Sequence, residues 1–238
     1  MKTFGLIGKS LSHSFSSRYF NEKFYKEGIT DTEYLNFEIN DINEFQQLIK
    51  KQNLSGINVT LPYKESIIPF LDELSENAKR IGSVNTIQIS NGKLIGHNTD
   101  IIGFKQSITP LLSGRNTALI LGDGGAAKAV KFIFNQLNIS HKTINRNSSF
   151  DYSDITSEII DFNTIIVNTT PLGMIPEIKN YPQIPYELLT EKHLLFDLIY
   201  NPKETLFLKY GRANKACTKN GLEMLQIQAE TSWNIWNT

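Results

Sequence analysis

The feature that most constrains the fold is a continuous apolar run, Thr117 to Leu121, followed at once by a glycine-rich turn, Gly122 to Gly125. An uninterrupted apolar strand is typical of a parallel sheet that helices cover on both faces. The small residues Ala126, Ala127 and Ala129 then open a helix-period stretch. A strand, a glycine turn and a helix in this order predict a dinucleotide-binding α/β domain.

Strand-length apolar runs and helix-period stretches alternate along the rest of the chain, which predicts an α/β fold throughout. The character of the runs changes after Asp100, so we expect a domain boundary near residues 100–105. The last helical stretch, residues 222–236, can pack against either half of the chain. The expected strands are 3–8, 32–39, 56–61, 84–89, 93–97, 117–121, 164–168 and 194–199, and the clearest helices are 14–28 and 222–236.

Composition excludes several classes of protein. Lys plus Arg total 24 and Asp plus Glu total 24, so no bulk charge attracts nucleic acid or an anionic membrane. Cys217 is the single cysteine, which leaves no internal disulfide and no cysteine zinc site; we expect it to be a small buried residue. The four histidines show no metal-ligand spacing, and no window approaches the roughly 20 apolar residues of a membrane span. The predicted location is the cytoplasm.

The glycine turn suits a phosphate group. Gly122 permits the tight turn, and Gly124 lets the backbone approach a pyrophosphate. The helix that follows offers unpaired N–H groups and a partial positive charge. The candidate cofactor residues of this loop are Gly122, Asp123, Gly124, Gly125 and Ala126.

The end of the next strand distinguishes the two nicotinamide cofactors. An NAD enzyme usually places Asp or Glu there to bind the ribose 2′-hydroxyl. Here the strand 141–144 is followed by Asn145, Arg146 and Asn147, with no acid. Arginine suits a 2′-phosphate by charge and by its planar fork, so the sequence favours NADP. A plain surface arginine is the alternative.

Many segments of the chain resemble, in order, the signature segments of the shikimate dehydrogenase family. The resemblance spans nearly the whole sequence. In the first half the matching segments are Ser12 to Ser16, Asn58 to Lys64, Gly82 to Thr86 and Gly96 to Asp100; in the second half they are Gly122 to Ala127, Asn145-Arg146, Asn168 to Met174, Asp197 to Pro202 and Gly221 to Ala229.

This resemblance implies an α/β protein of two domains with the active site in the cleft between them. Residues 1–101, joined by the C-terminal helix 222–238, would form the substrate-binding and catalytic domain, and residues 102–221 a Rossmann-like NADP-binding domain. The implied activity is the reversible NADPH-dependent reduction of 3-dehydroshikimate to shikimate, in aromatic amino acid biosynthesis. The implied partners are small molecules only, and the chain would be a monomer or a homodimer.

Ketone reduction requires a hydride donor, a proton donor and a substrate clamp. Lys64 follows a strand that Pro62 stops, a position that can aim its amine into a cleft, and it is the candidate proton donor. By resemblance, Asp100 is its partner carboxylate. Which of the two carries the proton stays open, because a coupled pair can titrate as a unit. A surface ion pair is the structural alternative.

The substrate residues are likewise implied by the resemblance. Ser14 and Ser16 would hold the carboxylate, although serine is also an ordinary helix cap. Tyr200 would border both substrate and nicotinamide, and Leu198 and Gly221 would line the nicotinamide side. The ring hydroxyls would be bound by Thr60, Asn85 and Gln228, along with Asn58.

Two features depart from the usual pattern of the family. Asp123 stands where alanine is common in the family, and a carboxylate beside a pyrophosphate is unfavourable unless it points away. The segment 147–161 is brief, which predicts a cofactor domain trimmed on one side. The rivals are a quinate/shikimate dehydrogenase using NAD, a non-catalytic NADP-binding sensor on the same fold, and a methylenetetrahydrofolate dehydrogenase, which would not need the paired serines.

Overall fold

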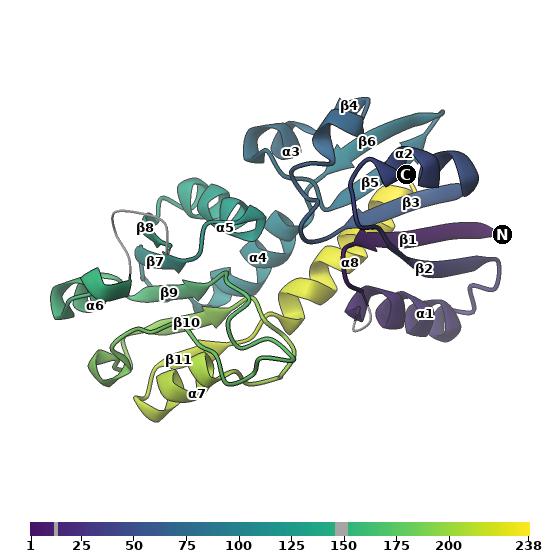
Figure 1. Ribbon diagram of the computed structural model, residues 1–238. Helices are drawn as coiled ribbons and strands as arrows, with labels where there is room; N and C mark the ends of the chain where they lie inside the picture. Colours follow the sequence, from purple (N-terminus) through teal and green to yellow (C-terminus); the bar gives the residue numbers. More distant parts are fainter. Residues whose placement is uncertain (12–13, 146–151) are drawn as a thin grey trace. The chain divides into compact units, whose positions relative to one another are not determined.

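The chain forms two compact α/β units in a computed structural model that describes residues 1–11, 14–145 and 152–238. Unit 1 consists of Met1–Thr99 and Ala229–Thr238, and unit 2 of Asp100–Gln228. Figure 1 labels the helices and strands of both units. The predicted α/β class is confirmed.

Unit 1 is built on a mixed six-stranded sheet of order β2-β1-β3-β5-β6-β4. Strands β1, β2 and β3 are parallel, whereas β3, β5 and β6 run antiparallel in turn. Because β1 and β3 are parallel neighbours, the residues that follow them meet at one edge of the sheet. The strands are β1 (Lys2–Gly8), β2 (Thr32–Glu38), β3 (Leu54–Val59), β4 (Glu73–Leu74), β5 (Thr86–Ser90) and β6 (Lys93–His97).

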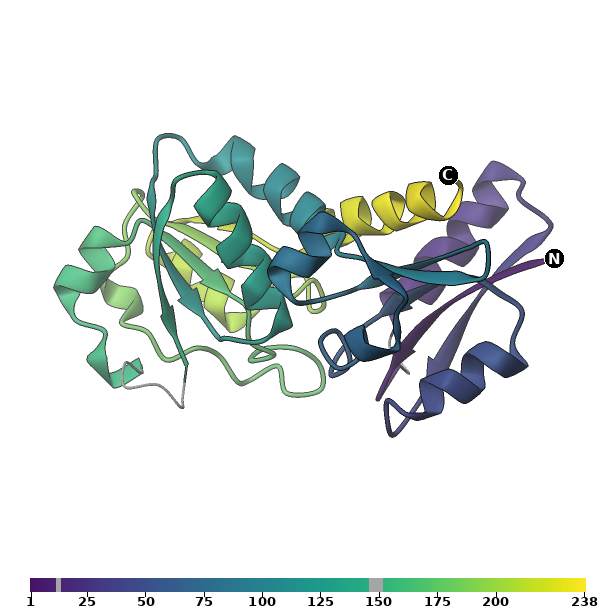
Figure 2. The same ribbon diagram turned by 90° about the horizontal axis from the view of Figure 1, so that it is seen from above.

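Helices cover both faces of this sheet, and each face has its own apolar core. One face packs on α2 (Glu44–Lys51) through Phe45, together with η1 (Ile68–Phe70) and α3 (Glu76–Ile81). The other face packs on α1 (Phe15–Glu27) and on the end of α8 (Leu222–Trp236). Figure 2 shows α1 and the end of α8 on one side of the sheet and α2 on the other.

Aromatic rings dominate the core beside α8. Trp236 stacks on Phe4 with ring centroids 4.8 Å apart, and its indole N–H donates to the Ile87 carbonyl at 3.0 Å. Gly56 makes this packing possible, because a Cβ there would lie 2.4 Å from the Trp236 ring. The prediction that Trp233 and Trp236 are core contacts is confirmed.

Unit 2 contains a parallel five-stranded sheet of order β11-β10-β9-β7-β8. The central strands are buried along their whole length apart from Thr117, as their apolar sequences predict. In the described part of the unit, β8 is the edge strand on this side of the sheet. The strands are β7 (Thr117–Leu121), β8 (Ser140–Ile144), β9 (Ile165–Asn168), β10 (Leu194–Asp197) and β11 (Cys217–Lys219).

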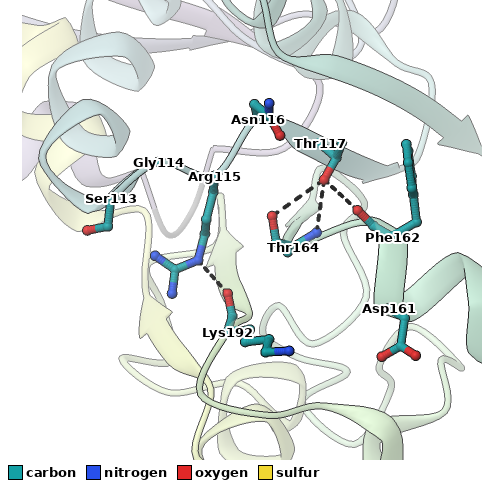
Figure 3. Close-up of a pocket in the computed structure, with 9 residues that line it drawn as sticks. All are labelled: Ser113, Gly114, Arg115, Asn116, Thr117, Asp161, Phe162, Thr164 and Lys192. Atoms are coloured by element: carbon teal, nitrogen blue, oxygen red, sulfur yellow. Dashed lines mark hydrogen bonds between the residues drawn. The ribbon is translucent and has the colours of Figure 1, made fainter.

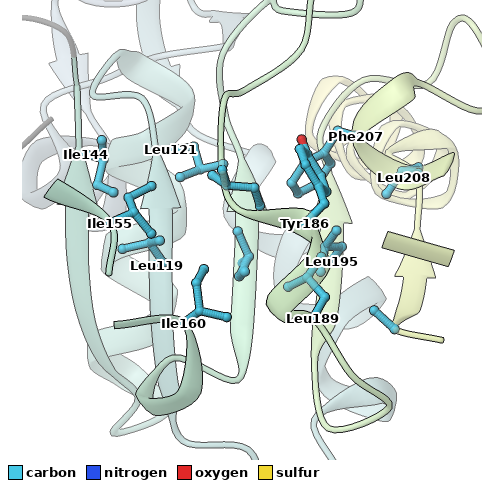
Figure 4. Close-up of a cluster of buried hydrophobic side chains, with 13 residues drawn as sticks. Leu119, Leu121, Ile144, Ile155, Ile160, Tyr186, Leu189, Leu195, Phe207 and Leu208 are labelled. Atoms are coloured by element: carbon cyan, nitrogen blue, oxygen red, sulfur yellow. The ribbon is translucent and has the colours of Figure 1, made fainter. Parts of the chain in front are cut away.

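Two layers of helix enclose this second sheet. On one face, Phe104 of α4 (Asp100–Ile108) makes edge contacts with Phe134 of α5 (Gly125–Gln136) and with Phe196 of β10. The other face carries the cluster drawn in Figure 4, which includes side chains from α6 (Ser157–Phe162) and α7 (Leu206–Ala213). The remaining short helices are η2 (Thr109–Leu111), η3 (Tyr152–Asp154) and η4 (Tyr186–Leu188).

Two local predictions are wrong. Cys217 is exposed rather than buried, since it begins the edge strand β11. Strand β10 ends at Asp197, two residues early, because the Asp197 carboxylate binds the Ile199 N–H and turns the chain.

Candidate functional site

The glycine loop lies where the connections of the unit 2 sheet diverge. The chain passes from β7 to β8 on one side and returns to β9 on the other. Such a switch point, at the carboxyl ends of the strands, is the usual ligand position in open α/β sheets. Gly122 has φ of +105°, and a Cβ there would lie 2.7 Å from the Thr169 hydroxyl. Only glycine fits this junction of β7 and β9.

The loop has the form that a pyrophosphate needs. Gly124 is the N-cap of α5, and a Cβ built on it would meet nothing within 4 Å. Its backbone is therefore open to a ligand, at the end of a helix that carries a partial positive charge. Gly125 and Ala127 are buried against the sheet, whereas Ala126 is half-buried. The residues present fit a dinucleotide.

The carboxylate of Asp123, the unusual residue of this loop, forms an ion pair with Lys131 on α5. The negative charge of Asp123 is thereby paired with a positive charge from the helix that follows the loop. Asn145 is half-buried and directly follows β8. Arg146 and Asn147, on which the NADP prediction partly rests, lie outside the described residues.

The residues predicted for the nicotinamide side follow β10. Leu198 and Tyr200 are half-buried there. Gly221, which precedes α8, donates its N–H to the Ile199 carbonyl at 3.0 Å, and a Cβ on it would lie 2.1 Å from the Leu198 carbonyl oxygen. The structure thus brings Gly221 against Leu198.

A buried carboxylate that the sequence analysis missed organises these loops. Asp197 accepts hydrogen bonds from the Asn168 amide at 3.0 Å, from the Ile199 N–H at 3.0 Å and from the Thr205 hydroxyl at 2.5 Å. Asn168 in turn accepts from the N–H and hydroxyl of Thr170. Burial raises the pKa of Asp197 to about 7. The only sequence signal was its place at the end of a strand in a family segment.

In unit 1, three predicted substrate residues follow the parallel strands β1 and β3. Ser14 is the N-cap of α1, and its hydroxyl accepts from the Ser17 N–H at 3.5 Å. Ser16, two residues on, is half-buried in the first turn of α1. Thr60 comes directly after β3 and donates its N–H to the Ile7 carbonyl at 2.9 Å. The structure therefore places all three after neighbouring strand ends.

Lys64 lies in the turn that follows β3 and is half-buried. Its carbonyl accepts from the Val84 N–H at 2.7 Å, which brings the lysine backbone next to the segment carrying Asn85. Asn85 is 3% exposed, and its amide oxygen accepts from the Thr99 N–H at 2.7 Å. Asp100 is the next residue in the chain, buried at the start of α4. Local packing in unit 1 thus joins Lys64 to Asn85, and Asn85 to the residue before Asp100.

Asn58 and Gln228 have different surroundings. The Asn58 amide nitrogen faces the Asn85 carbonyl, the Thr86 hydroxyl and the Ser232 hydroxyl, at 3.1 to 3.2 Å, and its oxygen accepts from Tyr34 at 2.8 Å. Its hydrogen-bonding capacity is used inside unit 1. Gln228 is buried on α8 and donates to the Leu225 carbonyl at 3.0 Å.

A concavity of about 550 Å³ in unit 2, drawn in Figure 3, is not the dinucleotide site. Its lining residues precede β7, β9 and β10, so it lies at the opposite edge of the sheet from the glycine loop. The Arg115 guanidinium donates to the carbonyls of Lys192, Glu191 and Leu111. Arg115 therefore joins the segment before β7 to the segment before β10 through hydrogen bonds.

In the residues that the structure describes, no three His, Cys, Asp or Glu side chains are grouped so as to hold a metal ion. Over the same ranges, none of the helices has the length and apolarity to cross a membrane. His97 is half-buried, and burial lowers its pKa.

The glycine loop at the switch point and the parallel sheet make unit 2 a dinucleotide-binding domain. Residues 6–87 match the family model described as the shikimate dehydrogenase substrate binding domain. The chain is 38% identical to a shikimate dehydrogenase (NADP(+)) of Methanococcus maripaludis, covering 99% of this chain and 91% of that protein. It is also 38% identical to the enzyme of the same name from Caldanaerobacter subterraneus, with 99% and 91% covered.

A solved structure supports the same family assignment. Shikimate dehydrogenase 1 from Peptoclostridium difficile superposes with a TM-score of 0.88 at 38% identity, covering 100% of this chain and 92% of that one. The chain belongs to the shikimate dehydrogenase family. It has that family's plan, an N-terminal α/β substrate-binding domain and a Rossmann-like NADP-binding domain.

Proposed function

We propose that this protein catalyses the reversible NADPH-dependent reduction of 3-dehydroshikimate to shikimate, an oxidoreductase step of aromatic amino acid biosynthesis. The observation that carries the proposal is the nearly full-length similarity to relatives named as NADP(+)-dependent shikimate dehydrogenases. Unit 1 with the end of α8 is the proposed substrate domain, and unit 2 the proposed cofactor domain.

NADP is the proposed cofactor, and it supplies the hydride when bound. Gly122, Gly124 and the N-terminus of α5 hold its pyrophosphate by close backbone approach and by unpaired N–H groups. Asn145, Arg146 and Asn147 would receive the ribose and its 2′-phosphate. This preference is supported by the arginine and by the lack of an acid after β8. Leu198 and Gly221 would line the nicotinamide.

Lys64 and Asp100 are the proposed acid–base pair. Reduction leaves negative charge on the former carbonyl oxygen, so a positioned proton donor lowers the barrier. The Lys64 ammonium gives a proton to that oxygen in the reductive direction and recovers it from the hydroxyl in the oxidative one. Asp100 holds the ammonium and accepts from the reacting hydroxyl. Their connection through Asn85 and Thr99 supports this assignment.

The remaining polar residues would hold the substrate. Ser14 and Ser16 donate hydroxyl protons to the carboxylate, assisted by the N-terminus of α1. Thr60, Asn85 and Gln228 would bind the ring hydroxyls, and Tyr200 would border substrate and nicotinamide. Asn58, whose amide is used by neighbours in unit 1, would act by positioning. A monomeric or homodimeric state and a cytoplasmic location stay predictions.

A matrix of initial rates tests the proposal: shikimate or quinate, each with NADP⁺ or NAD⁺. Activity concentrated in the shikimate and NADP⁺ combination is the expected result. Comparable activity with quinate and NAD⁺ would move the protein to the broader quinate/shikimate dehydrogenases and overturn the interpretation of Arg146. Folded protein that binds NADPH but is inactive in all four combinations would be a sensor.

A further inference from the structure

A buried cluster of hydroxyl and amide groups lies within unit 1, and one of its members comes from α8. The Ser232 hydroxyl lies 2.8 Å from the Thr86 hydroxyl and 3.2 Å from the Thr99 hydroxyl, and it accepts from the Asn58 amide at 3.1 Å. Ser232, Thr86 and Thr99 are at most 1% exposed. These hydrogen bonds therefore form where no solvent competes, so their geometry is strongly specified.

Asn85 is held by the same cluster. Its amide nitrogen donates to the Thr99 hydroxyl at 2.9 Å, and its oxygen accepts from the Thr99 N–H at 2.7 Å. The hydroxyls of Thr86 and Thr99 both lie 3.2 Å from that oxygen. A hydroxyl has one proton, so each threonine can donate to only one of three acceptors: the Asn85 oxygen, the Ser232 hydroxyl or the other threonine, whose hydroxyl lies 3.3 Å away. The Ser232 hydroxyl therefore influences which groups orient the Asn85 amide.

Ser232 also fixes the helix to which it belongs. It follows Gln228 by four residues on α8, so the two side chains share one face of the helix. A rotation of α8 about its axis would remove the Ser232 hydroxyl from the threonine hydroxyls and carry Gln228 with it. The serine thus links two proposed hydroxyl-binding amides, one through its contacts and one through its helix.

We propose that Ser232 is a positioning residue for shikimate, which orients Asn85 and sets the rotation of α8 through its buried hydroxyl. The inference rests on the proposed function. It differs from a general role in stability because the Asn58 amide has two protons and three acceptors. Removing the Ser232 hydroxyl leaves that amide satisfied, so the principal loss is the orientation of Asn85.

The test compares Ser232→Ala and Ser232→Cys with wild type in steady-state kinetics. The cysteine variant keeps the volume but bonds weakly, which separates the hydrogen bond from the void. We expect the KM for shikimate to rise on the order of threefold to tenfold, with the KM for NADP⁺ within about twofold. Ser107→Ala, which removes a buried hydroxyl bonded only to the carbonyls of its own helix, should change neither.

A double-mutant cycle with Asn85→Ala completes the test. If Ser232 acts through Asn85, Ser232→Ala adds little to the shikimate KM in the Asn85→Ala background. An unchanged shikimate KM in both Ser232 variants, an equal rise in the KM for NADP⁺, or full additivity would overturn the inference. Absence of wild-type activity on shikimate would instead overturn the proposed function. Should Ser232→Ala not fold, Ser232→Cys gives the same comparison.

Discussion

The carboxylate of Asp123 and the ammonium of Lys131, eight residues apart, form an ion pair beside the glycine loop. Asp123 stands in the loop that would meet the pyrophosphate, where a negative charge repels the ligand. Lys131 lies on α5, whose N-terminus forms part of that loop. The pair offsets the unfavourable charge of this chain's loop with a charge from the helix that follows.

Lys131→Ala should therefore weaken NADPH binding, on the order of threefold to tenfold, because it leaves the Asp123 carboxylate without its counter-charge near the phosphates. Asp123→Ala should strengthen binding, and the double variant should return close to wild type. The measurement is a fluorescence titration of NADPH at low salt, repeated at high salt, where screening should shrink the differences. Equal affinity in all four proteins would show that the pair has no electrostatic role.

Lys64→Ala should lower kcat more than tenfold, since positioned acid–base groups contribute about 10²–10⁴-fold. The dissociation constant for shikimate should change much less, because the ammonium acts mainly on the charge that develops during the reaction. Lys93→Ala is the matched control, since Lys93 pairs with Glu73 in the same unit on an exposed hairpin. Turnover near that of wild type in Lys64→Ala would remove the lysine from the mechanism.

The raised pKa of Asp197 predicts that the folded protein becomes less stable as pH rises. Burial raises its pKa from 3.8 to about 7 in the folded chain. Between these values the unfolded chain has lost the proton and the folded chain keeps it, so stability falls as pH rises. Below 3.8 both states are protonated, and above 7 the loss is complete, at most roughly 4 kcal/mol.

Asp197→Asn, which imitates the protonated carboxyl, should remove this dependence of stability on pH. Its free energy of unfolding relative to wild type should increase from pH 4 to pH 8, as measured by urea denaturation. Asp161→Asn, at an exposed acid of the same unit, should show no such trend. A difference that stays constant across the range would mean that Asp197 is ionised throughout.

Gly221→Ala should damage both stability and cofactor binding. The new Cβ would lie 2.1 Å from the Leu198 carbonyl oxygen, so the segment after β10 has to move. Overpacking of this kind costs about 1–3 kcal/mol, which corresponds to a Tm lower by several degrees. The KM for NADP⁺ should rise more than that for shikimate. An unchanged Tm would show that the loop yields without strain.

Much of the fold could be predicted from the sequence because its signals are local. The uninterrupted run of β7 marked a buried parallel strand, and the helix-period stretch 14–28 marked α1, which Ser14 and Gly28 cap. The exposed state of Cys217 and the early end of β10 could not be predicted. They depend on sheet order and on a tertiary hydrogen bond.

Some features of the candidate site could likewise be predicted from the sequence, and others could not. The backbone requirements at Gly122 and Gly124 could be predicted from the residue type, because few residues other than glycine fit a tight turn or let a ligand approach the backbone closely. The hydroxyl cluster around Ser232 joins residues far apart in the chain, and nothing near Ser232 distinguishes it from a solvent-facing serine. The ion pair between Lys131 and Asp123 could not be predicted either, since a lysine on a helix is ordinarily a surface residue.

Helix α8 has a consequence for how the protein matures. Residues 229–238 supply Trp236 and other side chains to the core of unit 1, while residues 100–228 form unit 2. On the ribosome, N-terminal domains generally fold first. Here the aromatic surface around Phe4 and Phe20 stays uncovered until residues 229–238, which follow all of unit 2 in the chain, have been synthesised. The second unit can therefore complete its folding before the first.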